Sequence, residues 1–342
     1  MRAYINIMKE FVMKKTNLID VYTIILAIAG ASAVILRTIA CLASFDTVIM
    51  HFDNSLCNSI ANGLVITSLL VFATYLFMES KDFCPIASND NAATYIPAGI
   101  LSIALLFVAA DRSVAFRQDY LFADGVLRYL CLAVVILAIV SVAAFFLMIF
   151  ITKNESTVKA AMFLGFVLYL CAYSAYLYFN RSVHPTNSPI KVVDQMAYLF
   201  SAIFFLYETR ITIGRPVWRP YVALGLVSSL MTAYSALPTL ITYIGSGRLL
   251  SDSIYETAVT LALCAFTTSR VLLTKKLCDS EQCQEAMSIQ MLFELREKEM
   301  ADRKHRPLVR EDDIIEENDT VDAENYSFDI PPVETSAEGN DE

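Results

Sequence analysis

Arg37 is the residue with the strongest chemical implication, because it lies inside a long apolar block, residues 21–45. A charged side chain in the hydrocarbon of a membrane costs about 2.5–3.5 kcal/mol on insertion scales, so it needs a partner or a wet cavity. One interpretation is a site that binds an anion or a carboxylate. The other is a structural ion pair with Asp111 or Asp194, which would have no further role.

Asp111, Asp194 and Tyr173 are the other residues that we expect to form a substrate site with Arg37. Both acids fall in the predicted outer half of an apolar block, and Tyr173 lies near the outer half of the block 158–179. Together the four side chains predict an outward-facing polar site. For Tyr173 the alternative is a place in the belt of aromatic side chains at the membrane surface.

Further ionisable residues lie near the ends of the apolar blocks. Arg112 and Glu256 add to the outer layer, although such side chains commonly snorkel to the lipid headgroups. An inner layer consists of Glu79, Glu208, Arg210 and Arg270. We expect this layer to form structural ion pairs, in particular of Glu79 or Glu208 with Arg270, rather than a proton relay.

Signals of enzymatic chemistry are missing from the sequence. It contains no GxxxxGK[ST] phosphate loop, no HExxH zinc motif and no GxSxG serine motif. The trio His51, Asp53 and Cys57 has poor spacing for a metal, and the eight cysteines contain no CxxC pair. We therefore predict that the protein is not an enzyme and that it holds no metal and no cofactor.

The elements that carry these residues are predicted from composition. Of the 342 residues, 56% are hydrophobic and 18% charged, and the mean hydropathy is +0.52, whereas soluble domains are about 45–50% apolar and about 25% charged. The apolar residues form eight blocks, at about 21–45, 60–78, 95–115, 129–152, 158–179, 192–213, 221–244 and 254–274. Each is near the length needed to cross a bilayer. The prediction is an all-α integral membrane protein with about eight transmembrane helices.

The sixth block is the weakest, because it is strongly apolar only at residues 196–207, and an interfacial or re-entrant segment is the alternative. The flanking charges favour a full crossing. With eight helices and the amino terminus inside, 13 Lys and Arg residues fall on the inner side and six on the outer side, as the positive-inside rule requires. We therefore expect both termini in the cytoplasm and place the protein in the plasma membrane.

A faint repeat and one proline bear on the arrangement of the helices. Glu79-Ser80-Lys81 and Glu208-Thr209-Arg210 close aromatic-rich blocks 129 residues apart, which suggests two parallel four-helix halves. The alternative is that inner helix ends often carry such residues.

Pro238 is expected to kink or interrupt the seventh helix.

The rest of the chain is divided by charge. Residues 1–20 are predicted as a cytoplasmic N-terminal segment, 21–276 as the polytopic domain, and 277–306 as a cytoplasmic juxtamembrane helix. Residues 307–342 are predicted as a disordered acidic tail, since residues 311–342 hold 13 acids and no Lys or Arg. The formal net charge of −9 belongs to this tail. No basic stripe is present, which excludes nucleic acid as a partner.

Three function classes follow, and a small-solute transporter or permease is favoured. It predicts a solvent-reaching cavity at the depth of Arg37. The second class is a membrane sensor or assembly scaffold whose C-terminal segment recruits a cytoplasmic protein partner, and it predicts a closed bundle with Arg37 fully paired. The third, a lipid-modifying enzyme, needs a cluster of acid, base or metal-ligand residues at the headgroups, and the sequence offers too few histidines for it. In each class the bilayer is the principal partner.

Overall fold

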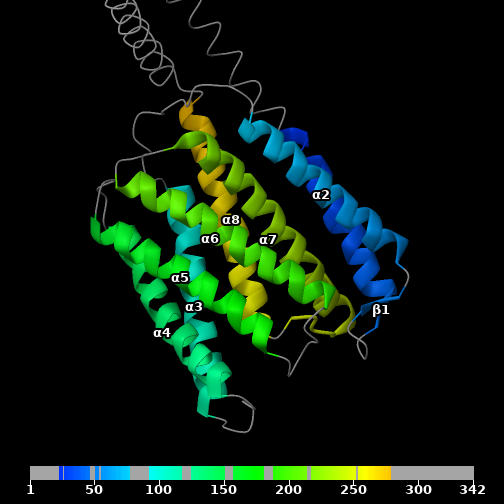
Figure 1. The fold of residues 1–342 in the computed structure, drawn as a ribbon, viewed down its shortest axis with the longest axis horizontal. Coiled ribbons are helices and arrows are strands. Elements are labelled where there is room, and N and C mark those ends of the chain that lie inside the picture. Colours follow the sequence, from blue (N-terminus) through cyan, green and yellow to red (C-terminus); the bar gives the residue numbers. More distant parts are fainter. Residues whose placement is uncertain are drawn as a thin grey trace, which may run out of the picture. The chain divides into compact units, whose positions relative to one another are not determined.

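The computed structural model describes residues 23–25, 27–46, 51–53, 55–77, 92–117, 125–150, 157–180, 188–213, 217–251 and 253–278. The first helix spans Thr23–Ala43. It is followed by β1 (Phe45–Asp46), β2 (His51–Phe52), α2 (Leu56–Phe77), α3 (Ala92–Arg117), α4 (Gly125–Phe150), α5 (Thr157–Phe179), α6 (Pro189–Thr212), α7 (Trp218–Ser246) and α8 (Ile254–Cys278), as Figure 1 shows. The predicted juxtamembrane helix beyond Cys278, the acidic tail and Glu79 lie outside the described residues.

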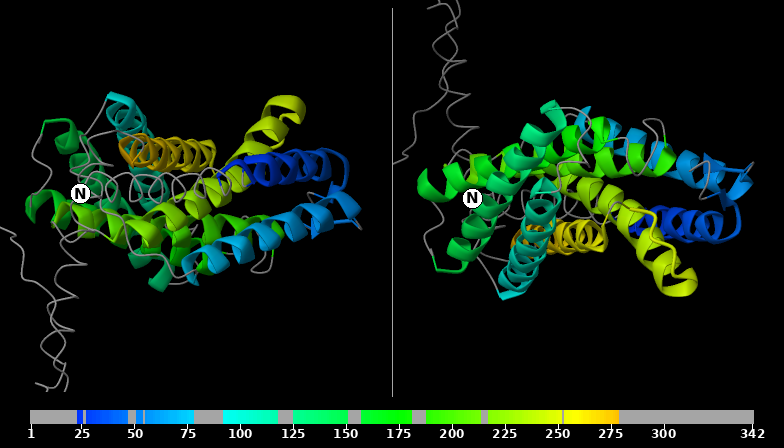
Figure 2. Two further views of the ribbon diagram at one scale, coloured as in Figure 1. Left: turned by 90° about the horizontal axis from the view of Figure 1, so that it is seen from above. Right: turned by 90° about the horizontal axis from the view of Figure 1, so that it is seen from below.

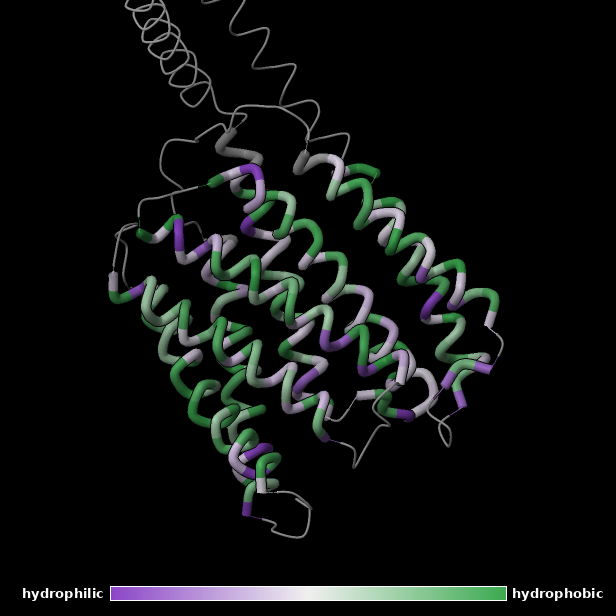
Figure 3. The backbone as a smooth tube through the Cα atoms, viewed as in Figure 1, coloured by the Kyte–Doolittle hydropathy of each residue, from purple (hydrophilic) through white to green (hydrophobic). Residues whose placement is uncertain are grey.

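Eight helices of the described part are long and apolar enough to cross a membrane by length and composition. The prediction of eight apolar helices is therefore confirmed, and the weak sixth block is a continuous helix of 24 residues. Hydrophobic residues run along the full length of the helices, and hydrophilic ones gather mostly near their ends (Figure 3). These features support a multi-pass membrane protein.

The outward faces of the helices are apolar as well as the core. Large side chains such as Ile28, Leu70 and Ile103 are each about 60% exposed. A helix that is hydrophobic all round is typical of a membrane span or of the core of a large protein. Here the apolar outer faces have no protein cover among the described residues, which agrees with contact to lipid.

Helices α3 to α8 form a closed ring. Each packs against the next along the chain, and α8 packs against α3. The first helix and α2 lie together to one side of this ring in both views of Figure 2, and α2 contacts it through α7. This grouping of six helices plus a pair differs from two four-helix halves. The internal repeat remains a prediction.

Aromatic side chains fill the interior of the ring. The ring of Phe145 on α4 lies 4.7–5.9 Å from the rings of Phe163, Phe166, Phe205 and Phe266, which come from α5, α6 and α8. All five side chains are fully buried. Edge-to-face pairs like these contribute about 0.5–1.5 kcal/mol each beyond the burial of their area. The interior at this level is thus a packed aromatic core.

Side chains of α6 and α8 pack directly against the backbone of α7 at Gly225. A Cβ atom added at Gly225 would lie 2.4 Å from Val271 Cγ2 on α8 and 3.0 Å from Phe204 Cε2 on α6. Glycine at this position therefore lets three helices pack closely. Pro238 lies inside α7, which remains helical from Trp218 to Ser246, so the proline does not interrupt the helix.

We expect Gly225→Leu to lower the free energy of unfolding by about 1–3 kcal/mol or more, because the new side chain overpacks the contact with Val271 and Phe204. Unfolding by sodium dodecyl sulfate, followed by circular dichroism in mild detergent, measures this change. The matched control is Gly63→Leu on α2, where nothing lies within 4 Å of an added Cβ. Equal stability of the two variants would contradict close packing at Gly225.

Candidate functional site

Arg112 on α3 is the centre of a buried polar cluster at the end of the ring where the β1–β2 hairpin lies, here called the hairpin end. Its side chain is in an ion pair with Glu256 of α8, and both residues are less than 10% exposed. Arg112 Nη1 donates to the hydroxyl of Tyr176 at 3.1 Å, and Nη2 donates to that of Tyr173 at 3.5 Å. Both tyrosines lie on α5, so the cluster joins three helices of the ring.

A second cation borders this cluster. Lys191 of α6 is 3% exposed, and its Nζ donates to the backbone carbonyl of Asn180 at 2.5 Å. Asn180 Nδ2 in turn donates to the Tyr176 hydroxyl at 3.4 Å. Lys191 thus donates a hydrogen bond to a backbone carbonyl just after the end of α5. A chain of hydrogen bonds runs from Lys191 through Asn180 and Tyr176 to Arg112.

A small polar cavity of about 10 Å³ lies between α6, α7 and α8 at the same end. Its walls include the carboxylates of Asp194 and Glu256 and the hydroxyls of Tyr198, Ser235 and Thr257. Ser235 Oγ donates to Asp194 Oδ1 at 2.5 Å. The volume suffices for about one water molecule. Buried carboxylate and hydroxyl oxygens around such a space are suited to a small polar or cationic ligand.

Arg37 lies apart from the cluster around Arg112. Its guanidinium carbon is 4.5 Å from the ring centroid of Tyr234 on α7 and 6.0 Å from that of Phe52 on β2. The Tyr234 hydroxyl donates to Asn62 Oδ1 at 2.7 Å. Arg37 is 2% exposed, and its Nη1 has no hydrogen-bond partner in the described part of the chain.

The opposite end of the ring carries a second buried ion pair. Arg270 Nη2 on α8 donates to Glu208 Oε1 on α6 at 2.6 Å, and the Tyr221 hydroxyl on α7 donates to Glu208 Oε2 at 2.8 Å. All three residues are at most 3% exposed. Arg210 is exposed and lies 5.8 Å from the Tyr207 ring. The pair therefore joins α6 to α8, while Arg210 lies outside it.

Of the four residues that the sequence predicts as one substrate site, three border the cluster of Arg112 and Glu256, and Arg37 lies apart from it. Tyr173 contacts Arg112, and Asp194 borders the small cavity. Asp111 is 36% exposed, with Oδ2 3.9 Å from Arg112 Nε. The ion pairs of the described residues include none between Arg37 and Asp111 or Asp194.

Sequence reasoning missed how deeply several polar residues are buried. The snorkelling interpretation of Arg112 and Glu256 is wrong, because each is buried against the other. Lys191, one of the six basic residues on the predicted outer side, is also buried. The spacing of Tyr173, Tyr176 and Asn180 at three and four residues was the available signal, because it places three polar groups on one face of α5.

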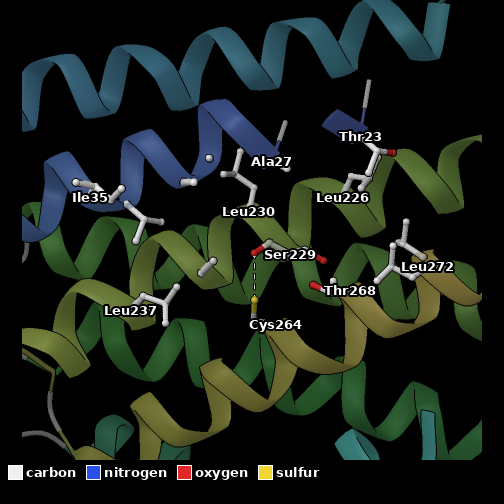
Figure 4. A pocket seen from close by; sticks show the side chains of 15 residues that line it. Thr23, Ala27, Ile35, Leu226, Ser229, Leu230, Leu237, Cys264, Thr268 and Leu272 are labelled. Carbon is white, nitrogen blue, oxygen red and sulfur yellow. Dashed lines mark hydrogen bonds between the residues drawn. The ribbon is translucent and has the colours of Figure 1, made fainter. Parts of the chain in front are cut away.

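An apolar cavity of about 390 Å³ lies between the first helix, α7 and α8. Figure 4 shows Thr23, Leu226 and Leu272 near one end of it and Ile35 and Leu237 near the other. Cys264 Sγ donates to the backbone carbonyl of Ser229 at 3.5 Å on its wall. This cavity is therefore elongated along the first helix.

Comparisons with protein-family models, curated proteins and solved structures found no match to this chain. Within the residues that the structure describes, no group of three or more His, Cys, Asp and Glu side chains is arranged to hold a metal ion. The interpretation below therefore depends on the geometry of the polar clusters and cavities.

Proposed function

We propose that the protein is a plasma-membrane transporter or permease for a small polar solute, with both termini in the cytoplasm, and that the form described here is closed. The observation that supports this proposal is that α8 takes part in two buried ion pairs. Glu256, near the start of α8, contacts Arg112, and Arg270 contacts Glu208. Glu256 and Arg270 are 14 positions apart, or about 21 Å along the helix.

Buried ion pairs are poor stabilisers, because desolvating two charges offsets most of their attraction, and apolar replacements of similar volume are often equally stable. Two such pairs at opposite ends of one helix are therefore better explained as contacts that break and re-form than as contacts that stabilise the fold. Alternating opening of the two ends would require such contacts. We propose that α8 separates from α3 at the hairpin end and from α6 at the other end.

The proposed solute site is the cavity lined by Asp194 and Glu256. This differs from the site predicted from sequence, because Arg37 does not line this cavity and is nearly fully buried beside Tyr234. Breaking the Arg112–Glu256 pair would expose the Glu256 carboxylate to the cavity and widen it. The cavity is small in the closed form, which favours a small polar solute or a cation.

The test is the access of a membrane-impermeant maleimide to a cysteine at Thr257→Cys, a cavity residue that is 3% exposed. The protein, otherwise without cysteine, is reconstituted in liposomes. We expect Arg112→Met alone, which leaves the Glu256 carboxylate without its counter-charge, to raise the rate of labelling from the outside at least tenfold, because the closed form loses its contact.

The matched control is Arg270→Met alone, which removes the corresponding cation at the other end of α8. We expect this variant to leave labelling from the outside at or below the rate of the parent protein. Equal rates in all three proteins, with normal elution from a sizing column, would contradict the proposed gating and favour the scaffold.

A membrane sensor or assembly scaffold is the second candidate. The observation that favours it is the aromatic core around Phe145, which leaves the ring packed at that level. In this case the helices would anchor the C-terminal segment, which would recruit a cytoplasmic protein partner. We propose no enzymatic reaction in either case.

A further inference from the structure

The elongated apolar cavity between the first helix, α7 and α8 has an open side. Ala31 and Ile35, on its first-helix wall, are exposed, Ile35 to 59%. Along the first helix the cavity runs from Thr23 to Ile35, about 18 Å at the rise of an α-helix. A groove of this length and about 390 Å³ in volume fits one extended hydrocarbon chain better than a compact solute.

Arg37 follows the last groove residues of the first helix, Val34 and Ile35, and is not itself part of the groove lining. Thr23, Ala27, Gly30 and Val34 line the groove from one face of the first helix, and Arg37 is the next residue on that face by the same spacing of three and four. On α7, Leu230 and Leu237 line the groove. Tyr234, whose ring contacts the Arg37 guanidinium, lies between them in the sequence.

Among the residues that the structure describes, no carboxylate forms an ion pair with the Arg37 guanidinium. Arg37 Nη1 has no hydrogen-bond partner among the described residues, and Arg37 is 2% exposed. The contact with the Tyr234 ring compensates only part of the charge, since an aromatic ring carries no net charge. A buried cation with an unused donor, just past the last first-helix residues of an apolar groove, is complementary to an amphiphile with an anionic head.

We propose that the groove binds a long-chain fatty acid, with its chain against the first helix, α7 and α8 and its carboxylate on Arg37. A carboxylate matches a guanidinium in geometry and forms strong charge-assisted hydrogen bonds. The near-complete burial of Arg37 beneath Phe52 and Tyr234 favours this compact head over a phosphodiester with its glycerol. The site is distinct from the polar cavity at Asp194 and does not depend on transport.

The test uses the full-length protein in nanodiscs of phosphatidylcholine, with radiolabelled palmitate as the probe and hexadecanol as an equally long competitor without charge. We expect saturable palmitate binding to the wild type and at least tenfold weaker competition by hexadecanol. Arg37→Gln should weaken palmitate binding at least tenfold. Ala31→Phe should do the same, because the new ring fills the groove from its exposed side.

Two matched variants control for charge and bulk. Arg128→Gln removes an exposed arginine of α4, and Ala143→Phe adds a ring at an exposed alanine of α4 outside the groove. We expect both to bind palmitate like the wild type. If Arg37→Gln does not fold, Ala31→Phe and the comparison of palmitate with hexadecanol still decide the question.

Three results would overturn the proposal. The first is no saturable palmitate binding. The second is equal competition by hexadecanol and palmitate, which would mean that the head is not recognised. The third is displacement of palmitate by phosphatidic acid at lower concentrations than by unlabelled palmitate, which would identify a phospholipid as the ligand.

Discussion

Replacing Arg270 with Met is expected to lower the free energy of unfolding by about 3–5 kcal/mol, because it leaves the Glu208 carboxylate buried without its counter-charge. Glu208 is 1% exposed and would keep the hydrogen bond from Tyr221. Unfolding by sodium dodecyl sulfate, measured by circular dichroism in mild detergent, gives the change in free energy.

The double variant Arg270→Met/Glu208→Leu separates loss of the pair from loss of packing. It should recover most of the stability, because apolar residues of similar volume carry no desolvation cost. Arg210→Met is the control for a nearby exposed arginine and should change stability by less than about 0.5 kcal/mol. A double variant as unstable as Arg270→Met would show that the pair itself stabilises the ring and would weaken the case for a breakable contact.

Phe145→Ala is expected to lower the free energy of unfolding by about 3–5 kcal/mol, because it opens a cavity between four aromatic rings. Phe145 is fully buried, and its partners lie on α5, α6 and α8. The loss should therefore loosen contacts among four helices of the ring. The same detergent unfolding measurement applies.

The neighbouring residue supplies the control. Phe146 is 56% exposed on the outer face of α4, so Phe146→Ala removes a ring that lies largely outside the packed interior. We expect a loss of no more than about 0.5–1 kcal/mol. A loss as large as that of Phe145→Ala would mean that the outer face of α4 packs against protein, such as another copy of the chain.

The proposed transport and the proposed fatty-acid site make independent demands on the molecule. Gating depends on contacts within the ring, between α8 and either α3 or α6. Fatty-acid binding depends on the groove between the first helix, α7 and α8 and on Arg37. The residues of the two ion pairs do not line this groove, so variants of the ion pairs and variants of the groove change different side chains.

The sequence by itself determined the eight helices and their approximate ends. A span of apolar residues long enough to cross the bilayer must satisfy its own backbone hydrogen bonds, which makes it a helix wherever its neighbours lie. This is why even the weak block at 192–213 could be predicted, and the structure has a helix at Pro189–Thr212. Length and hydropathy are local properties and require no knowledge of the packing.

Only the tertiary structure decided which charges meet. Arg112 and Glu256 are 144 positions apart, and Glu208 and Arg270 are 62 apart. Because the bilayer favours apolar residues on every side of a helix, hydropathy does not reveal which face turns inward. The closure of α8 onto α3 therefore decided that Arg112 is buried against Glu256, and the position of the first helix beside α7 decided that Arg37 contacts Tyr234.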